Sequence, residues 1–226
     1  MKKFILLILS LINTAVTAAF IAVNPNKVLP SHFGVNGNAD AYASKWALLL
    51  VPCILVVFSI AFAIYAAIKE KDESYKSYKK YAERCIGAIF VFLLVIFWVM
   101  QVMVLQNASN MGNLFFPLIS ITMGCMFAFI NNLMPKIKQN STLGFKTRAT
   151  LRSKTVWKKV HRFAAYLGVI GGITVVFLGV ISLFATGIAN VLFFISLIII
   201  LASAIIPAIY GEIIYSKEKK SKVNVE

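Results

Sequence analysis

Residues 85–106 read CIGAIFVFLLVIFWVMQVMVLQ and contain no charged side chain. A helix rises about 1.5 Å per residue, so about 20 apolar residues cross a hydrocarbon core about 30 Å thick. Five further apolar runs of similar length flank this one: Phe4–Val23, Trp46–Ile68, Leu114–Met134, Phe163–Ala185 and Ala189–Ile214. A soluble fold of this size has no interior large enough for six such segments. The sequence therefore predicts an integral membrane protein.

The composition agrees with this prediction. Of the 226 residues, 60% are hydrophobic and 14% are charged, whereas a soluble domain has about a quarter of its residues charged. Backbone groups in lipid must be hydrogen-bonded internally, so each run is expected to be a helix. Segments of about 10 residues with alternating polarity, which mark a membrane β-barrel, do not occur in the sequence. We expect an all-α integral membrane fold, a bundle of six transmembrane helices.

The basic residues are unevenly distributed between the connecting segments. Of the 23 Lys and Arg, 21 lie in the N-terminus, the 69–84 loop, the 135–162 loop and the C-terminal tail. The positive-inside rule places these segments, and both termini with them, in the cytoplasm. Six crossings also return the chain to its starting side. The net charge of +15 thus indicates contact with the anionic headgroups of a lipid bilayer and no direct binding of nucleic acid.

The first apolar run follows Lys2 and Lys3, as in a secretory signal peptide. Its apolar stretch is longer than the usual core of about 7–15 residues, and Asn24-Pro25-Asn26 is a poor cleavage site. We expect this run to be retained as a transmembrane helix. The chain then divides into an N-terminal helix pair (1–68) with an outer loop (24–45), a cytoplasmic loop (69–84), and a four-helix region (85–226) with a cytoplasmic loop (135–162).

The outer loop contains Asn36-Gly37, a pair typical of a tight hairpin turn. Four side chains are expected to form a small packed unit around this turn: His32, Phe33, Val35 and Tyr42. In the 69–84 loop, Tyr75, Tyr78 and Tyr81 lie three residues apart. This spacing suits either a short helix with one aromatic face or a solvated extension of the flanking helices. We favour the extension.

Two stripes of polar or small residues lie inside the apolar runs. Ser10, Asn13, Thr14 and Thr17 share one face of the first helix, and Ala164, Gly168 and Gly172 share one face of the fifth. Small and weakly polar residues let helices approach closely, so both stripes are more typical of packing seams than of a substrate path. Three cysteines in or beside apolar runs are interpreted as small buried hydrophobic residues: Cys53, Cys85 and Cys125.

The sequence offers no catalytic or metal-binding constellation. His32 lies in the outer loop and His161 at the inner boundary, so about 30 Å of hydrocarbon separates them and they cannot share a metal ion. Patterns such as HExxH, GxSxG and the P-loop do not occur. We therefore expect neither enzymatic activity nor a cofactor or metal. Glu212 is the acidic residue inside an apolar run, and an ion pair with Arg162 or His161 is expected there; the alternative is a snorkelling side chain.

Two stretches carry a resemblance to a known family. Residues Leu29–Lys45 read LPSHFGVNGNADAYASK, with Leu-Pro, His-Phe, an Asn-Gly turn, an acidic residue and a final Lys. Residues Asn131–Arg162 read NNLMPKIKQNSTLGFKTRATLRSKTVWKKVHR, with Met-Pro-Lys at a helix end and Trp and His-Arg entering the next helix. Both resemble the SdpI/YfhL family of bacterial immunity-type membrane proteins.

The resemblance implies a set of peptide-binding or partner-binding residues. In the outer loop these are His32, Phe33, Asn36, Gly37 and Asp40. In the second stretch they are Asn132, Pro135, Lys136, Asn140, Gly144, Lys146, Thr147, Thr150, Trp157, His161 and Arg162, and the motif also matches at Met134, Leu151 and Ser153. The family usually has Arg at Lys146, Pro-Trp at Arg148-Ala149 and Thr at Val160. The Lys146 difference removes a planar, bidentate donor.

The resemblance also implies a function in a bacterial plasma membrane. Family members protect a producing cell against a secreted toxic peptide that disrupts membranes, and they tether a cytoplasmic transcriptional repressor as signal receptors. We therefore expect an immunity protein that meets a toxic peptide on its outer side and a repressor protein in the cytoplasm. The basic loop 135–162 has the alternative role of contacting lipid headgroups. The alternative function for the whole chain is a small transporter or drug-resistance permease, which requires a polar stripe facing a water-filled cavity on at least two helices.

Overall fold

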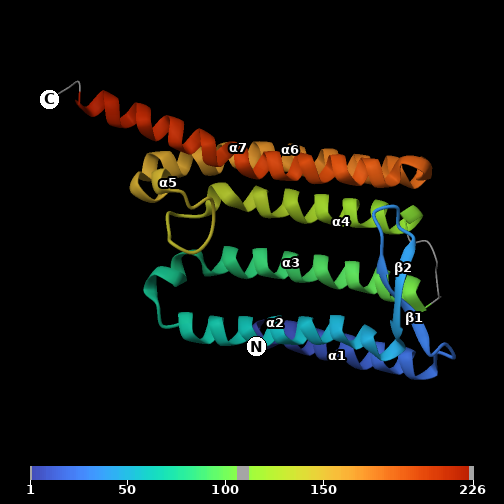
Figure 1. Ribbon diagram of the computed structural model, residues 1–226. Helices are drawn as coiled ribbons and strands as arrows, with labels where there is room; N and C mark the ends of the chain where they lie inside the picture. The colour runs from blue at the N-terminus through green and yellow to red at the C-terminus, as the bar shows by residue number, and fades with distance from the viewer. Residues whose placement is uncertain (1, 106–111, 224–226) are drawn as a thin grey trace.

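Six long helices lie side by side in the structure, a computed structural model that describes residues 2–105 and 112–223 (Figure 1). They are α1 (Lys2–Val23), α2 (Leu50–Lys69), α3 (Glu73–Leu105), α4 (Gly112–Leu133), α6 (Lys154–Phe184) and α7 (Ala189–Val223). Each is long and apolar enough to cross a membrane. The predicted all-α, multi-pass membrane bundle is confirmed. Gln106, the last residue of the 85–106 run, lies outside the described residues.

A β-hairpin connects α1 to α2. Strand β1 (Val28–Phe33) pairs antiparallel with β2 (Ala39–Ser44), with a shift in register around His32. Gly37 has φ of 79°, a conformation that glycine adopts without steric cost. Its N–H donates to the carbonyl of Gly34 at 2.8 Å. The hairpin turn predicted from Asn36-Gly37 is confirmed. A 3₁₀ turn, η1 (Lys45–Leu49), leads from the hairpin into α2.

The packed unit predicted around this turn is wrong. Phe33 packs beside Leu29 and Val104, on the inner side of the hairpin. Val35 and Tyr42 instead remain 68% and 57% exposed. The reason is that the end of α3 offers the hairpin a larger apolar surface than its own turn does.

The hairpin and the longest connecting loop lie at opposite ends of the bundle (Figure 1). That loop contains the 3₁₀ turn η2 (Met134–Lys136) and the short helix α5 (Arg148–Arg152). We call residues 134–153 the loop cap. The C-terminus lies at the loop-cap end. A third 3₁₀ turn, η3 (Thr186–Ile188), connects α6 to α7.

The tyrosines of the 69–84 segment lie in the first turns of α3, so this segment extends the flanking helix, as favoured from the sequence. It is not a solvated extension, however, because Tyr75 and Tyr78 are fully buried. They belong to an apolar cluster with Leu133, Met134 and Trp157. The helix therefore continues past the apolar run in order to pack against the loop cap.

Helices α4 and α6 approach each other most closely. A Cβ on Gly124 would lie 2.6 Å from the carbonyl oxygen of Gly172, and a Cβ on Gly172 would lie 2.7 Å from that of Gly124. Gly168 likewise faces the side chain of Asn131 without room for a Cβ. The packing seam predicted from the small residues of this helix is therefore confirmed, and α4 is its partner.

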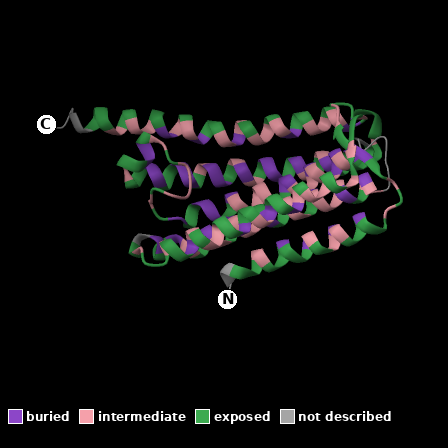
Figure 2. Ribbon diagram, turned by 60° about the horizontal axis from the view of Figure 1, so that its bottom comes forward, coloured by how far each residue is buried: buried purple, intermediate pink, exposed green. Residues whose placement is uncertain are grey.

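Burial in Figure 2 is concentrated on the faces that the helices turn toward one another, whereas exposed residues cover the outside. Many exposed residues are large and apolar, including Phe58, Phe177 and Ile198, as expected of helices surrounded by lipid. Cys85 is buried, but Cys53 and Cys125 are exposed. The prediction of three buried cysteines is therefore wrong for two of them, because these two lie on outward helix faces.

Candidate functional site

Asn140 closes the first turn of the loop cap. Its Oδ1 accepts hydrogen bonds from the backbone N–H groups of Thr142 at 2.8 Å and Leu143 at 2.7 Å. Its Nδ2 donates to the carbonyl of Lys138 at 2.8 Å. Nδ2 also donates to the carbonyl of Leu143 at 3.2 Å. One carboxamide thus satisfies four backbone groups in a segment that has no regular secondary structure. The side chain is engaged in holding the loop.

Gly144 and His161 form the next contact of the loop cap. Gly144 has φ of +113°, and a Cβ at this position would overlap the Nε2 atom of His161. The neighbouring Phe145 N–H donates to His161 Nε2 at 3.1 Å. Because Nε2 accepts, the proton of the neutral ring lies on Nδ1, which donates to the carbonyl of Trp157 at 2.9 Å. Both nitrogens of this imidazole therefore have partners inside the protein.

Trp157 connects the loop cap to α6. Its ring stacks on His161 with centroids 4.0 Å apart and an interplanar angle of 19°. Its Nε1 donates to the carbonyl of Ile137 at 2.8 Å. Trp157 and His161 are only 2% and 1% exposed. The pair therefore acts as an internal support for the loop and presents no surface to a ligand.

Thr147 and Thr150 form a capping box at the start of α5. The Thr147 N–H donates to Thr150 Oγ1 at 2.9 Å, and the Thr150 hydroxyl donates to the carbonyl of Phe145 at 2.7 Å. The Thr150 N–H in turn donates to Thr147 Oγ1 at 3.3 Å. The capping box thus satisfies the N–H groups of both threonines at the start of the helix.

Glu212 of α7 also serves α5. Its Oε1 accepts from the backbone N–H of Ala149 at 3.2 Å. Among the described residues, no ion pair joins Glu212 to Arg162, and both ring nitrogens of His161 have other partners. The predicted ion pair therefore does not form. The free N–H groups and the positive dipole end of a short helix are a nearby partner for this carboxylate.

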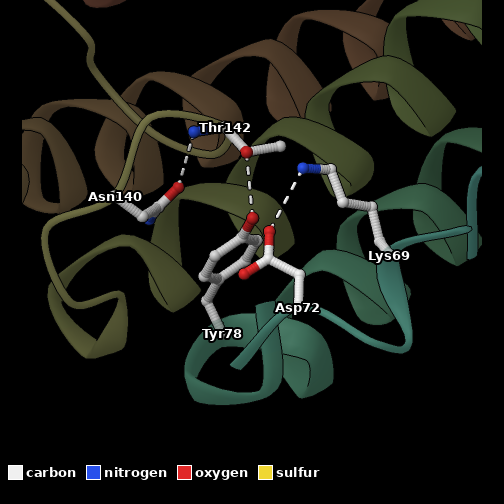
Figure 3. Close-up of polar contacts among 5 residues, drawn as sticks. All are labelled: Lys69, Asp72, Tyr78, Asn140 and Thr142. Carbon is white, nitrogen blue, oxygen red and sulfur yellow. Dashed lines mark hydrogen bonds and ion pairs between the residues drawn. The ribbon is translucent and has the colours of Figure 1, made fainter. Parts of the chain in front are cut away.

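Tyr78 links the loop cap to α3. Its hydroxyl donates to Thr142 Oγ1 at 2.9 Å, directly beside the turn that Asn140 closes (Figure 3). In the same view, Lys69 pairs with Asp72 at 3.2 Å in the short connection between α2 and α3. The loop cap is thus fixed from two sides, by α6 and by α3.

The hairpin forms a second group of predicted residues. At its tip His32 Nδ1 lies 2.5 Å from Asp40 Oδ1, and both side chains are exposed. Asn36 Oδ1 accepts from the N–H of Asn38 at 3.1 Å. At the base, Lys45 Nζ donates to the carbonyl of Asn24 at 2.8 Å. Since lysine complements a helix C-terminus, Lys45 ties the hairpin to the end of α1.

An apolar cavity of about 300 Å³ lies beneath the hairpin. Its walls include Leu29 and Phe33 of β1, Leu48 of η1, and Phe97, Met100 and Gln101 of α3. Most of the lining is hydrocarbon, and Gln101 contributes a carboxamide to it. Pockets of this kind, apolar with few polar groups, are typical binding sites for small apolar groups.

Polar side chains from three helices meet just below this cavity. Ser10 of α1 lies 2.9 Å from the Ser59 hydroxyl of α2. Thr17 of α1 lies 3.0 Å from Gln101 Oε1 of α3. Asn13 lies between Ser10 and Thr17 on the same face of α1. We call these five residues the polar cluster.

Parts of the polar cluster have no protein partner. Among the described residues, Asn13 Oδ1, Asn13 Nδ2 and Gln101 Nε2 are buried without a hydrogen bond. Each such group costs about 1–3 kcal/mol of folding free energy. The stripe on α1 thus packs against α2 and α3 through Ser10 and Thr17, as a seam would, and it also contains a buried carboxamide without a partner.

The comparisons with known proteins assign the two ends of the chain. Residues 136–211 match the SdpI/YfhL protein family, and residues 8–56 match a domain of unknown function, DUF1648. The chain thus carries an SdpI/YfhL region over residues 136–211, which confirms the resemblance found in the sequence. It is therefore a membrane protein of the immunity type. No curated protein and no solved structure matches the chain.

The SdpI/YfhL region begins at the loop cap and continues through α6 into α7. The candidate residues in and beside it fall into two classes. Six are engaged in internal bonds or packing: Asn140, Gly144, Thr147, Thr150, Trp157 and His161. Five are exposed: Asn132, Pro135, Lys136, Lys146 and Arg162. Much of the family pattern thus specifies the conformation of one loop, and the remaining residues of the pattern lie exposed on its surface.

The positions that depart from the family pattern lie either on the surface or in one small apolar cluster. Lys146 is exposed, so the loss of an arginine fork there affects the surface. Ala149 and Val160 belong to one buried apolar cluster with Val156, so these two departures lie in the same small core.

Sequence reasoning missed Tyr78, Thr142 and the cavity beneath the hairpin. The tyrosine spacing indicated an aromatic face but not its partner.

Proposed function

We propose that this SdpI/YfhL protein protects a bacterial plasma membrane against a secreted, membrane-active peptide. The proposal involves no enzymatic step and no cofactor. By the positive-inside rule the basic loop cap and both termini face the cytoplasm, and the hairpin faces outward. A peptide arriving from outside then meets the hairpin end first.

The apolar cavity beneath an exposed hairpin is the observation that carries the proposal. Val35, Tyr42 and Trp46 are more than half exposed around it, at the end where the bundle leaves the hydrocarbon. An apolar patch in contact with water is typical of an interaction site. His32 and Asp40 add a polar pair at the tip, suited to hydrogen bonding with a peptide.

The loop cap supports a second part of the same proposal, a contact with a cytoplasmic repressor protein. Its exposed Lys136, Lys146 and Arg162 stand on a segment that internal hydrogen bonds hold in one conformation. Near Arg162, Lys158 and Lys159 line a groove of about 580 Å³ with Tyr166 and Tyr210. A fixed basic surface suits an acidic protein surface, and it also suits anionic headgroups.

The experiment is a survival assay in cells that lack the gene and carry it on a plasmid. Cells with the wild-type gene should keep their membrane potential and survive a challenge with the peptide. A double Val35→Ser and Tyr42→Ser variant should express normally, because both side chains are exposed, but protect less. Thr186→Ala, an exposed change in η3 at the same end, is the matched control. Equal survival with and without the gene would refute the proposal.

A small transporter is the second candidate, favoured by the polar cluster. The transporter hypothesis required a polar stripe that faces a water-filled cavity on at least two helices. The cluster brings polar residues from α1, α2 and α3 together, although the cavities beside it are apolar. Flux of a substrate or ion across liposomes containing the purified protein would favour transport. Liposomes that stay tight while the protein protects cells would favour the immunity function.

A further inference from the structure

We propose that Asn13 and Gln101 form a binding site for the backbone of an apolar peptide segment that inserts beneath the hairpin. The site rests on the proposed function and deepens it, because it names the chemistry by which an inserted peptide is held. The segment would place apolar side chains in the cavity of about 300 Å³ and a peptide group against the two carboxamides.

The two carboxamides are available for such a contact. Both residues are 3% exposed, and Asn13 has no hydrogen bond at either end of its carboxamide. The Thr17 hydroxyl donates to the backbone carbonyl of Asn13 at 2.8 Å, and it also lies 3.0 Å from the side-chain oxygen Oε1 of Gln101. Since a hydroxyl carries one proton, Thr17 satisfies only one of these acceptors at a time. Most of the hydrogen-bonding capacity of both carboxamides is therefore unused.

The neighbouring serines show that this part of the bundle pairs its polar groups where partners exist. Ser10 and Ser59 lie within hydrogen-bonding distance of each other across α1 and α2, and each also reaches a carbonyl of its own helix. Their two hydroxyl protons fill two of these three contacts at a time, so neither hydroxyl lacks a partner. Leucine has the same branching and the same number of side-chain heavy atoms as asparagine, and it would remove an unpaired group from a lipid-enclosed interior. A sequence that keeps the Asn13 carboxamide and Gln101 Nε2 buried without a partner among the described residues departs from the rule for stability, and such departures are typical of functional sites.

The chemistry of the unpaired atoms selects the ligand. A carboxamide offers one donor and one acceptor side by side, which matches the C=O and N–H of a peptide backbone. A lipid chain has neither group and leaves both carboxamides unpaired. A cation would need oxygen ligands and charge, and no Asp or Glu belongs to the cluster. A peptide backbone with apolar side chains is therefore the ligand that fits both the cluster and the cavity.

The packing around the cluster provides a route for insertion. Gln101 lies on the wall of the cavity beneath the hairpin. Ser59 lies on the wall of a second apolar cavity of about 460 Å³, where Phe58 and Phe62 of α2 face Ile86 and Phe90 of α3. The polar cluster thus lies between two cavities. Helices α2 and α3 make few contacts with each other, so a segment inserted there would displace little packing.

The test uses the full chain in dodecyl maltoside and a blocked apolar tripeptide, N-acetyl-leucyl-leucyl-leucine amide, as the probe. Binding is measured by the rise in thermal unfolding temperature as the probe is added. Methyl laurate, which is apolar but has no N–H, is the second probe. The variants are Asn13→Leu and Gln101→Leu. The control is Thr122→Val, whose hydroxyl bonds to the Leu118 carbonyl within α4.

We expect each leucine variant to be at least as thermostable as the wild type and to bind the tripeptide at least about tenfold more weakly, because hydrogen bonds to the backbone are lost. The control should bind like the wild type. Equal tripeptide binding by wild type and variants would overturn the site, as would equal stabilisation by methyl laurate. Leucine variants that unfold at lower temperature would show a structural role and also overturn it.

A failure of the proposed function gives a different result. In that case the wild type binds the tripeptide and the variants do not, but cells with and without the gene survive the toxic peptide equally. If instead the wild type protects cells and both leucine variants protect them equally, the proposed function stands and this site is refuted.

Discussion

The α4–α6–α7 half of the bundle and the α1–α3 half are built on different principles. In the first, glycines bring backbones into contact, and the connecting loop cap has its polar groups paired. In the second, two apolar cavities and two unpaired carboxamides lie between the helices. From this comparison we infer that the α4–α6–α7 half is the more rigid one. The α1–α3 half contains the space that a ligand could occupy. Each prediction below tests one side of this contrast.

The largest effect is expected at the α4–α6 seam. A Gly172→Val change places a Cβ against the backbone of Gly124 and Ala128, so the helices must separate at a cost of at least about 3 kcal/mol. Thermal unfolding in detergent and the yield of folded protein measure this. Gly187→Ala, which meets no atom within 4 Å, is the control. If the Gly172→Val protein were as stable as the wild type, close packing of α4 against α6 would not distinguish this half of the bundle from the α1–α3 half.

The loop cap should be nearly as sensitive. Gly144→Ala requires a positive φ in alanine and pushes into His161, so we expect a loss of about 2–4 kcal/mol. Limited proteolysis should show faster cleavage within residues 137–147. Gly87→Ala, a helical position with open space around it, is the matched control and should resist cleavage like the wild type. Unchanged cleavage of the Gly144 variant would mean that the loop is not held by this contact.

A smaller effect is expected where α7 caps α5. Removing the carboxylate with Glu212→Ala should cost about 1 kcal/mol, since one N–H of α5 loses its acceptor. Arg162→Ala should leave the unfolding temperature unchanged, because Arg162 is exposed and has no ion pair with Glu212. If a double-mutant cycle gave a coupling free energy between Glu212 and Arg162, the two residues would form an ion pair, contrary to the structure.

The smallest effect on stability is expected at the hairpin tip. His32→Ala and Asp40→Ala each remove one exposed pair, which contributes at most about 1 kcal/mol. Protection against the peptide should nevertheless fall, because the tip lies on the proposed peptide-binding surface. Survival and unfolding temperature measured on the same variants separate the two effects. A variant that loses stability and protection together would assign the tip a structural role instead.

Local rules predicted much of the fold. Run length set the six helices, Asn36-Gly37 set the hairpin turn, and the four-residue spacing of Gly168 and Gly172 set a close-packing face. Each of these features depends on residues near one another in the chain. The candidate site was only partly predictable. The matched motif located the loop cap, but Trp157 and His161 proved to be buried supports, since burial depends on neighbours brought from α3 and the loop.

Sequence alone determined that this protein lies in a membrane, how many times it crosses, and which helix faces are small or polar, because solvent and helical periodicity act on each segment separately. Tertiary structure alone decided which faces meet. It paired Glu212 with Ala149 and not Arg162, buried Tyr75 and Tyr78, and brought Thr17 of α1 against Gln101 of α3. These contacts join residues far apart in the chain, and a periodic pattern shows which way a side chain points but not what it meets.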